Sequence, residues 1–330
     1  MKSVVAQRHG GPEVLELADR HEPVVDAHDV LIEVRAASLN PLDYKLRTGK
    51  AKLAIPVEPP IPLGCDVAGV VSATGGEVTR FNVGDEVFAR LEKLRMGGLA
   101  ERVAADERVV AHKPTRASFI EAAAIPLAGL TALQALRDCA QLRAGQRVLI
   151  HAGAGGVGSL AIQIAKIMGL HVLTTTSGKN VDFVKSLGAD EVIDYTAERV
   201  LDRAHDLDAV FDTLGSTELD SIAAVKRGGV VVGIGGLPDL AFARASLPAW
   251  IRPALWLMTM KRRRAAASAG VRFVYLFMRP DGEQLAELAR WIDAGTLRPI
   301  VHRTYPLTEF REAFAELERG RARGKIVMTI

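Results

Sequence analysis

One segment limits what this chain can fold into more than any other: an apolar run that breaks into glycines and resumes with helical spacing. Residues 147–151 have the pattern of a buried strand, and glycines 153, 155 and 158 follow as G-x-G-x-x-G. Apolar residues then recur every three or four positions up to Gly169, which predicts a helix ending there. The glycines alone are a weak signal, but the order strand, turn, helix predicts a turn that binds phosphate.

Each glycine of this turn has its own expected role. Gly153 allows the tight turn, Gly155 lets backbone approach a pyrophosphate, and Gly158 lets helix and strand pack closely. The expected cofactor contacts of the turn are Gly153, Ala154, Gly155, Gly156, Val157 and Gly158. The alternative is a structural turn without a ligand, which the flanking strand and helix make less favourable.

Length and composition bound the class of protein. The 330 residues suffice for about two domains, and 48% hydrophobic with 25% charged residues is typical of soluble proteins. The first residues lack a signal-peptide pattern, so we expect a cytoplasmic protein. Only Cys65 and Cys139 are present, too few for a disulfide framework or a four-cysteine zinc site.

The pattern of the chain changes near residue 122. Up to residue 112, short strand-like runs alternate with turn residues, which predicts a mainly antiparallel, barrel-like domain. Strands and helices then alternate, which predicts an α/β fold with a doubly wound parallel sheet. Expected strands lie at 171–176, 191–194, 208–212, 229–234 and 271–277, and expected helices near 180–187 and 217–226. Beyond Pro280 we expect a helix, a strand, a helix and a final strand.

The end of the second strand of this sheet indicates which coenzyme binds. Chains that select NAD usually carry Asp or Glu about 20 residues beyond the glycines. This chain has Ser177 and Lys179 instead, whose hydroxyl and ammonium groups would stabilise a 2'-phosphate. We therefore expect NADPH, with Tyr195 as a weaker third contact. The alternative for Lys179 is an ordinary solvated lysine.

Further motifs extend over nearly the whole chain. They lie at 38–45, 64–71, 84–87, 130–132, 145–158, 212–215 and 323–327. With them the chain resembles the zinc-independent quinone oxidoreductase (zeta-crystallin-like) and enone reductase branch of the medium-chain dehydrogenase/reductase superfamily.

The resemblance implies a domain organisation. A GroES-like catalytic domain would span residues 1–125 and a Rossmann NADPH-binding domain residues 126–265. Residues 266–330 would add the last Rossmann strand and return to the catalytic domain. A cleft between the domains would hold nicotinamide and substrate, and a homodimer would form through the sheet edge near 271–277.

The resemblance also implies the site residues. Asn40 would donate its amide to the substrate oxygen or the nicotinamide ribose, Tyr44 would stack on the acceptor or deliver a proton, and Lys45 would stabilise an enolate. Packing for Tyr44 and solvation for Lys45 are equal alternatives, and Asp43 could serve only as a helix cap. Thr131 would be the fourth catalytic residue, with its side chain at the nicotinamide end, and the alternative is a hydroxyl bonded within its own helix. The remaining implied contacts of the cofactor are Leu214, Gly233, Ile234 and Lys325.

Two departures from zinc alcohol dehydrogenases of the same superfamily indicate the chemistry. Asn40 stands where those enzymes have a zinc-binding cysteine, and 64–66 replaces their histidine segment, so no metal is expected. Without a Lewis acid the acceptor must already be electron-poor. We therefore expect quinones or α,β-unsaturated carbonyls, with Lys45 favouring conjugated enones. The alternatives are an enoyl thioester reductase, and an NADPH-binding scaffold or redox sensor with little turnover.

One basic segment stands apart. Residues 241–280 contain eight Lys and Arg and no acid, and 248–260 contributes two tryptophans directly before the basic run 261–264. We expect a lid or dimer-edge element that narrows the substrate cleft. A solvated face is one alternative and a peripheral membrane contact a less favoured one, since the segment is too short to span a bilayer. No nucleic acid partner is expected.

Overall fold

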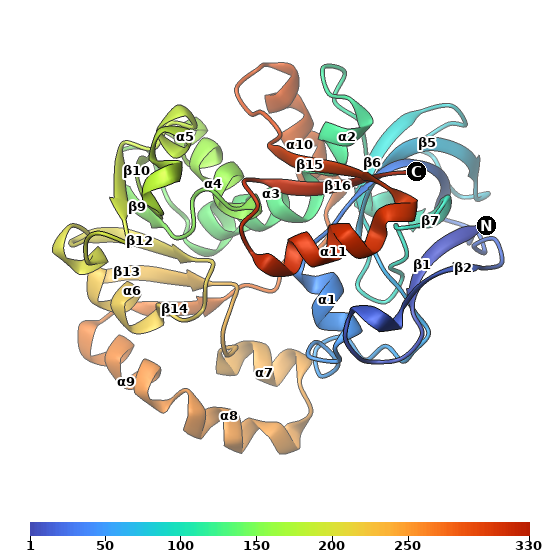
Figure 1. Cartoon of the computed structure of the whole chain (residues 1–330). Helices are drawn as coiled ribbons and strands as arrows, with labels where there is room; N and C mark the ends of the chain where they lie inside the picture. The colour runs from blue at the N-terminus through green and yellow to red at the C-terminus, as the bar shows by residue number, and fades with distance from the viewer. The chain divides into compact units, whose positions relative to one another are not determined.

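The computed structural model describes residues 1–330, and its contacts divide the chain into two compact units. Unit 1 consists of Met1–Leu130 and Arg279–Ile330, and unit 2 of Thr131–Met278. The colours of Figure 1 follow the chain from blue in unit 1, through green to orange in unit 2, and back to unit 1 in red. None of the helices combines the length and apolar character that a membrane crossing requires.

Unit 1 is built on two sheets. The smaller has the order β2-β1-β4, and the larger the order β15-β16-β3-β5-β6-β8 with β7 paired to β3. Every pairing is antiparallel except that of β15 with β16, which confirms the expected mainly antiparallel domain. The strands are β1 (Lys2–Ala6), β2 (Leu15–Asp19), β3 (Asp29–Ser38), β4 (Ile61–Pro62), β5 (Asp66–Thr74), β6 (Glu86–Arg90), β7 (Arg102–Asp106), β8 (Val110–His112), β15 (Val301–Pro306) and β16 (Lys325–Thr329).

β3 pairs with the C-terminal strand of the chain. Its alternating residues Val30, Ile32 and Val34 are buried as the sequence pattern predicts, and β16 pairs antiparallel with its far end. The C-terminal segment is therefore part of unit 1. The helices of unit 1 are α1 (Pro41–Arg47), α2 (Phe119–Ala123), α10 (Gly282–Asp293) and α11 (Phe310–Arg319). α3 (Pro126–Leu133, which continues as the π-helical residues Gln134–Cys139) begins in unit 1 and passes into unit 2 at Thr131.

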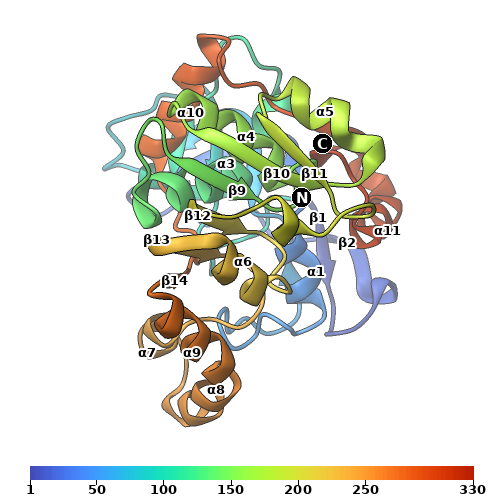
Figure 2. The same cartoon turned by 90° about the vertical axis from the view of Figure 1, so that its left-hand side faces the viewer.

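Unit 2 contains one six-stranded parallel sheet of order β11-β10-β9-β12-β13-β14 (Figure 2). This is the order of a dinucleotide-binding Rossmann sheet, so the predicted doubly wound sheet is confirmed. Its strands are β9 (Arg147–Ile150), β10 (His171–Thr176), β11 (Glu191–Asp194), β12 (Leu207–Asp212), β13 (Val225–Gly233) and β14 (Arg272–Tyr275). Its helices are α4 (Gly156–Ile167), α5 (Val181–Ser186), α6 (Glu218–Ala224), α7 (Leu240–Ser246), α8 (Arg252–Met258) and α9 (Met260–Ala269).

One predicted boundary in this unit is wrong. The helix expected near 217–226 ends at Ala224, and the strand expected from 229 begins at Val225. Val225 adopts extended backbone and pairs with Leu207 of β12, so pairing with a distant strand overrides the local helical pattern.

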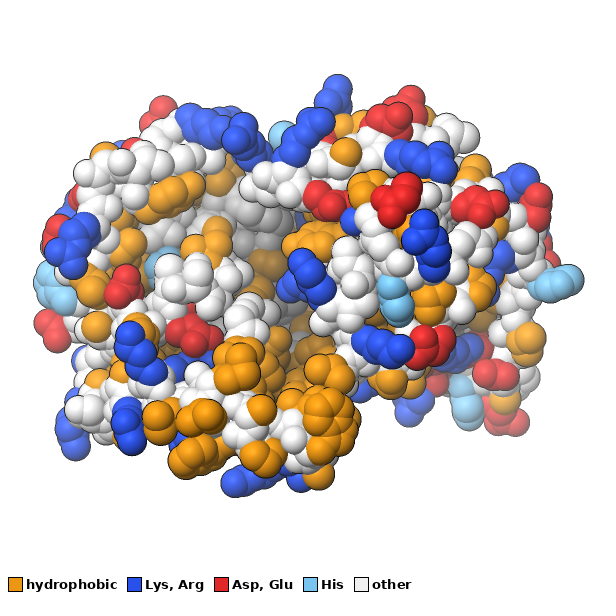
Figure 3. All heavy atoms as spheres, turned by 60° about the horizontal axis from the view of Figure 1, so that its bottom comes forward, with side chains coloured by type: hydrophobic (Ala, Val, Ile, Leu, Met, Phe, Trp, Pro, Cys, Tyr) orange, Lys and Arg blue, Asp and Glu red, His pale blue; other side chains and the backbone are white.

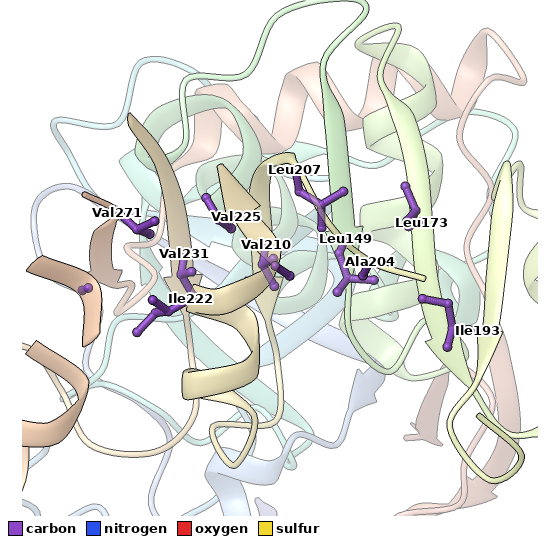
Figure 4. Packing of buried hydrophobic residues seen from close by; sticks show 12 residues of the cluster. Leu149, Leu173, Ile193, Ala204, Leu207, Val210, Ile222, Val225, Val231 and Val271 are labelled. Atoms are coloured by element: carbon purple, nitrogen blue, oxygen red, sulfur yellow. The ribbon is translucent and has the colours of Figure 1, made fainter. Parts of the chain in front are cut away.

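Buried apolar side chains fill one face of the parallel sheet (Figure 4). The strand residues Leu149, Leu173, Ile193, Val210 and Val231 form one cluster with Ile222 of α6, Ala266 of α9 and Ala204, which follows β11. Side chains alternate along a strand, so Thr174 faces the other side, where an added Cβ at Gly153 would meet both Thr174 and Ile162 of α4. Helices therefore cover both faces, and the glycine turn lies at the carboxyl edge of the sheet.

Candidate functional site

The glycine turn joins β9 to α4. Gly155 is the N-cap of α4, and the amides of the first helical turn have no partner within the helix. The left-handed residue of the turn is Ala152, with φ 53°, and not Gly153. This corrects the role expected for Gly153: a Cβ there would collide with Thr174, so the first glycine is needed for close packing on β10.

The other two glycines differ in their surroundings. A Cβ at Gly158 would collide with the carbonyl oxygen of Ala152 and lie 2.8 Å from Cα of Gly153, so helix and turn pack backbone on backbone. A Cβ at Gly155 would meet only the Ala152 oxygen, at 3.3 Å. The side of the turn at Gly155 is thus open. An open backbone beside unpartnered helix amides fits the pyrophosphate of a dinucleotide.

The predicted 2'-phosphate contacts lie at the carboxyl ends of neighbouring strands. Ser177 and Lys179 follow β10, Ser177 half-buried and Lys179 exposed, and Nδ2 of Asn180 donates to Oγ of Ser177 at 3.2 Å. Tyr195 follows β11 directly and is exposed. Because β10 and β11 pair in parallel, their following residues leave the sheet at the same edge.

The sequence reasoning missed a carboxylate at this place. Oδ2 of Asp194 would lie 2.7 Å from a Cβ added at Gly178. The hydroxyl and amide of Thr196 donate to its other oxygen and hold the pKa of Asp194 below its usual value. Asp194 pairs in register with Thr176, the last residue of β10. Aligning the ends of the two predicted strands was the signal that could have found it.

Three further predicted contacts lie at the ends of β12 and β13. The amides of Leu214 and Gly215 both donate to Oδ1 of Asp212 at 2.9 Å, and the Leu214 side chain is exposed. The amide of Ile234 donates to the Asp212 carbonyl at 3.1 Å. Ile234 follows Gly233, so the structure brings these residues together at the carboxyl edge that carries the glycine turn.

His151, just before the turn, is buried beneath it. Its Nδ1 lies 3.1 Å from Oγ1 of Thr175 and its Nε2 3.3 Å from Oγ of Ser221. Burial lowers the pKa of His151, although the carboxylates of Asp212 and Asp220 oppose that shift. The imidazole therefore supports the turn as a neutral hydrogen-bonding group.

In unit 1, the predicted catalytic segment begins α1. The carboxylate of Asp43 accepts from the amides of Asn40, at 2.7 Å, and Gly64, at 2.9 Å, which confirms its capping role. Burial raises the pKa of Asp43 to about 6. Tyr44 is half-buried and Lys45 is exposed on the same helix.

The side chain of Asn40 is buried in a polar cluster. Its Nδ2 donates to Oδ2 of Asp66 at 2.9 Å and lies 3.4 Å from Sγ of Cys65. Its Oδ1 accepts from Nζ of Lys325. That ammonium also donates to the Leu39 carbonyl at 2.7 Å and lies 3.5 Å from Oδ2 of Asp66. Both ends of the Asn40 amide, and the ammonium of Lys325, are thus engaged within unit 1.

The remaining predicted catalytic residue, Thr131, lies in α3 and is buried. By sequence it belongs to unit 2, whereas Asn40, Tyr44, Lys45 and Lys325 belong to unit 1.

The donor set of this cluster does not fit zinc. No group of three or more His, Cys, Asp or Glu side chains is arranged to hold a metal ion. Burial raises the pKa of the Cys65 thiol well above its usual value, which disfavours the thiolate that zinc requires. The Asp66 carboxylate is already paired with Lys325 and Asn40. These side chains therefore do not form a zinc site.

The two units together define a class: a GroES-like antiparallel unit combined with a Rossmann unit that has an open glycine turn. Comparison with family models agrees. Residues 26–115 match the alcohol dehydrogenase GroES-like domain, and residues 187–328 match a family described as zinc-binding dehydrogenase.

Known proteins match nearly the whole of this chain. The chain is 36% identical to 2-methylene-furan-3-one reductase of Solanum lycopersicum and to the chloroplastic NADPH-dependent alkenal/one oxidoreductase of Arabidopsis thaliana, each over 99% of this chain and 79% of the relative. A solved quinone oxidoreductase from Coxiella burnetii superposes with a TM-score of 0.86 at 35% identity, covering 100% of this chain and 99% of that one. The chain therefore belongs to the medium-chain dehydrogenase/reductase superfamily, in its quinone oxidoreductase and enone reductase branch, as the motifs predicted.

Proposed function

We propose that this protein is an NADPH-dependent oxidoreductase that reduces quinones or the C=C bond of α,β-unsaturated carbonyl compounds. The observation that carries the proposal is the glycine turn, which is open at Gly155 and lies at the carboxyl edge of a Rossmann sheet. The relatives support the substrate class, since one is named for reducing a methylene-furanone and another for alkenals and alkenones.

Residues at the ends of β10 and β11 support the phosphorylated coenzyme. The ammonium of Lys179 and the hydroxyl of Ser177 would bind a 2'-phosphate, and Tyr195 offers a third contact from β11. Asp194 opposes this preference, because a carboxylate beside Gly178 repels a phosphate and attracts ribose hydroxyls. In our proposal the contacts to the phosphate outweigh that repulsion, and one of the relatives is named for NADPH.

The residues of α1 would act on the acceptor. When bound, the reduced nicotinamide supplies hydride. Lys45 then stabilises negative charge on the conjugated oxygen, and Tyr44, one residue earlier, delivers the proton. The Nδ2 group of Asn40 would have to release Asp66 before donating to an acceptor, and its Oδ1 already accepts from Lys325, so we assign Asn40 to holding the start of α1 in place. A contact of Thr131 with the nicotinamide end belongs to the same proposal.

A panel of acceptors tests the proposal. Purified protein with NADPH should reduce a quinone, an alkenal and an alkenone but not a saturated aldehyde, because only the conjugated acceptors can delocalise the developing charge. An enoyl thioester in the same panel tests the closest alternative activity. Binding of NADPH without turnover of any acceptor would favour the scaffold or sensor instead.

A matched pair of lysine variants tests the role of α1. Lys45→Met should lower kcat/KM for the alkenone by about 100-fold, the usual cost of losing an oxyanion-stabilising group, with NADPH affinity unchanged. Lys50→Met removes another exposed lysine soon after α1 and should have little effect. Equal activities of the two variants would remove Lys45 from the mechanism.

A further inference from the structure

Helices α7 to α9 carry a surface that the proposed chemistry does not use. Four large apolar side chains are exposed there: Trp250 at 76%, Trp256 at 50%, Leu257 at 62% and Met258 at 63%. Figure 3 shows hydrophobic side chains gathered over the lower part of that view, with Lys and Arg at their edges. Singly exposed apolar residues are ordinary, but a contiguous group that includes two tryptophans indicates a contact surface.

The opposite side of α8 and α9 is anchored on unit 2. Leu255, Thr259, Arg262 and Ala266 are buried and repeat at helical spacing along one side. The guanidinium of Arg262 donates to Oε1 of Glu218 at 2.8 Å. Because the buried side is held in this way, the remaining side of the two helices is presented to solvent.

The exposed side is strongly basic. Of the six Lys and Arg between residues 240 and 269, Arg262 is buried and paired with Glu218, which leaves a formal charge of +5 with no acid in the segment. The five remaining cations are Arg244, Arg252, Lys261, Arg263 and Arg264. The guanidinium of Arg263 lies 4.8 Å from the Trp256 ring, so cationic and apolar groups are interleaved. Tryptophan beside Lys and Arg is typical of segments at membrane interfaces.

A pocket beside the tryptophans offers a place for one anionic group. It has a volume of about 380 Å³, and its lining includes Arg244, Arg252 and Trp256. Nη2 of Arg252 donates to the carbonyls of Arg244 and Leu247, but its Nε is buried without a hydrogen-bond partner. An oxygen of a lipid phosphate in this pocket would meet the positive charges of Arg244 and Arg252.

Charge decides between the two simplest occupants. A second copy related by a two-fold axis would place one basic surface against another, so repulsion would oppose the contact. A bilayer with anionic headgroups neutralises the cations and takes up the apolar side chains. We propose that α7–α9 docks on anionic lipid bilayers, with Trp250, Trp256, Leu257 and Met258 at the boundary between headgroups and acyl chains. This proposal is independent of the reductase activity.

Co-sedimentation of the full chain with vesicles tests the proposal. Binding to vesicles of phosphatidylcholine with one-third phosphatidylserine should be at least about tenfold stronger than to phosphatidylcholine alone, and should weaken as salt rises. The third tryptophan of the chain, Trp291, lies in α10 of unit 1. In Trp291→Phe protein, emission from the two surface tryptophans should therefore shift to shorter wavelength on binding.

Two double variants separate the contributions of charge and apolar contact. Lys261→Glu with Arg264→Glu should lower the vesicle partition coefficient at least about tenfold, and Trp250→Ser with Trp256→Ser should do likewise. Arg143→Glu with Arg321→Glu makes the same change in net charge at exposed positions of other segments. This control variant should keep nearly the same vesicle partition coefficient as the wild type. Thermal unfolding checks that every variant is folded.

Four outcomes would overturn the proposal. Equal binding to both vesicle types would show that the anionic headgroups are not recognised. Unchanged vesicle binding by the tryptophan variant would show that charge alone attracts the protein and that the apolar side chains take no part. If the tryptophan variant instead lost an oligomeric state seen by analytical ultracentrifugation, or changed only the KM for bulky acceptors, the surface would be a subunit contact or a lid.

Discussion

Nζ of Lys325 on β16 lies 3.5 Å from Oδ2 of Asp66 on β5, and both side chains are almost completely buried. β3 lies between these two strands in the sheet. Lys325 also contacts the Leu39 carbonyl and Asn40, which follow β3 and begin α1. One ammonium group therefore connects the ends of three strands at the start of the proposed catalytic helix.

Replacing this ammonium should be costly. Lys325→Met leaves the Asp66 carboxylate buried without its cation, so we expect the free energy of unfolding to fall by about 3–5 kcal/mol, measured by urea denaturation. Adding Asp66→Asn should make the combined loss smaller than the sum of the single losses. Lys185→Met, at an exposed lysine of α5, should change stability by less than about 0.5 kcal/mol. Similar values for Lys325→Met and Lys185→Met would contradict the structural role.

Asp43 should make stability depend on pH in the unusual direction for a carboxyl group. Burial raises its pKa from the ordinary 3.8 to about 6, so the folded state favours the protonated form. Its contribution to stability is fully present below pH 3.8 and is lost as the pH rises through about 6. Relative to Asp43→Asn, the unfolding free energy of the wild type should fall by about 3 kcal/mol across this window. Urea denaturation of both proteins at several pH values measures this difference. If the unfolding free energies of the wild type and Asp43→Asn changed in parallel with pH, the raised pKa of Asp43 would be refuted.

Substitutions at two glycines of the turn should affect different properties, coenzyme affinity at Gly155 and stability at Gly158. Gly155→Ala adds a Cβ on the open side, so NADPH affinity measured by calorimetry should fall at least about tenfold with stability nearly unchanged. Gly158→Ala places its Cβ against backbone and should destabilise the fold by about 1–3 kcal/mol. Gly76→Ala has no atom within 4 Å of the added Cβ and serves as the neutral control. A stable Gly158→Ala protein, or tight NADPH binding by Gly155→Ala, would count against this division.

Lys179 and Asp194 should shift coenzyme selectivity in opposite directions. Lys179→Ala should lower kcat/KM for NADPH by about tenfold, because a phosphate loses a charged partner, with little change for NADH. Asp194→Asn should raise kcat/KM for NADPH and lower it for NADH. Steady-state kinetics with both coenzymes and one alkenone measures the ratio. Equal changes for the two coenzymes in either variant would place that residue outside the 2'-phosphate site.

The parts of the fold that could be predicted are those with local signals. The apolar runs of β9 and β10, the glycines between β9 and α4, and the alternation of strand and helix after residue 170 all lie within short stretches of chain. The cap of α1 was predictable too, because Asn40 and Asp43 are three residues apart.

Other features depend on how segments separated in the sequence are brought together, so no local pattern shows them directly. Asp194 stands beside Gly178 only because β10 and β11 pair in that register. The left-handed residue of the glycine turn is Ala152, although glycine tolerates that conformation better, because packing against Thr174 and α4 sets the path of the chain.

The sequence by itself determined that this chain builds an antiparallel unit and a Rossmann sheet with a phosphate-binding turn, because strand and helix periodicity and glycine spacing are local properties. Only the tertiary structure decided that Lys325 engages Asp66 and Asn40, and that the tryptophans of the basic segment face solvent. Those outcomes depend on strand order and on which side of a helix is buried. Both result from contacts between residues far apart in the chain.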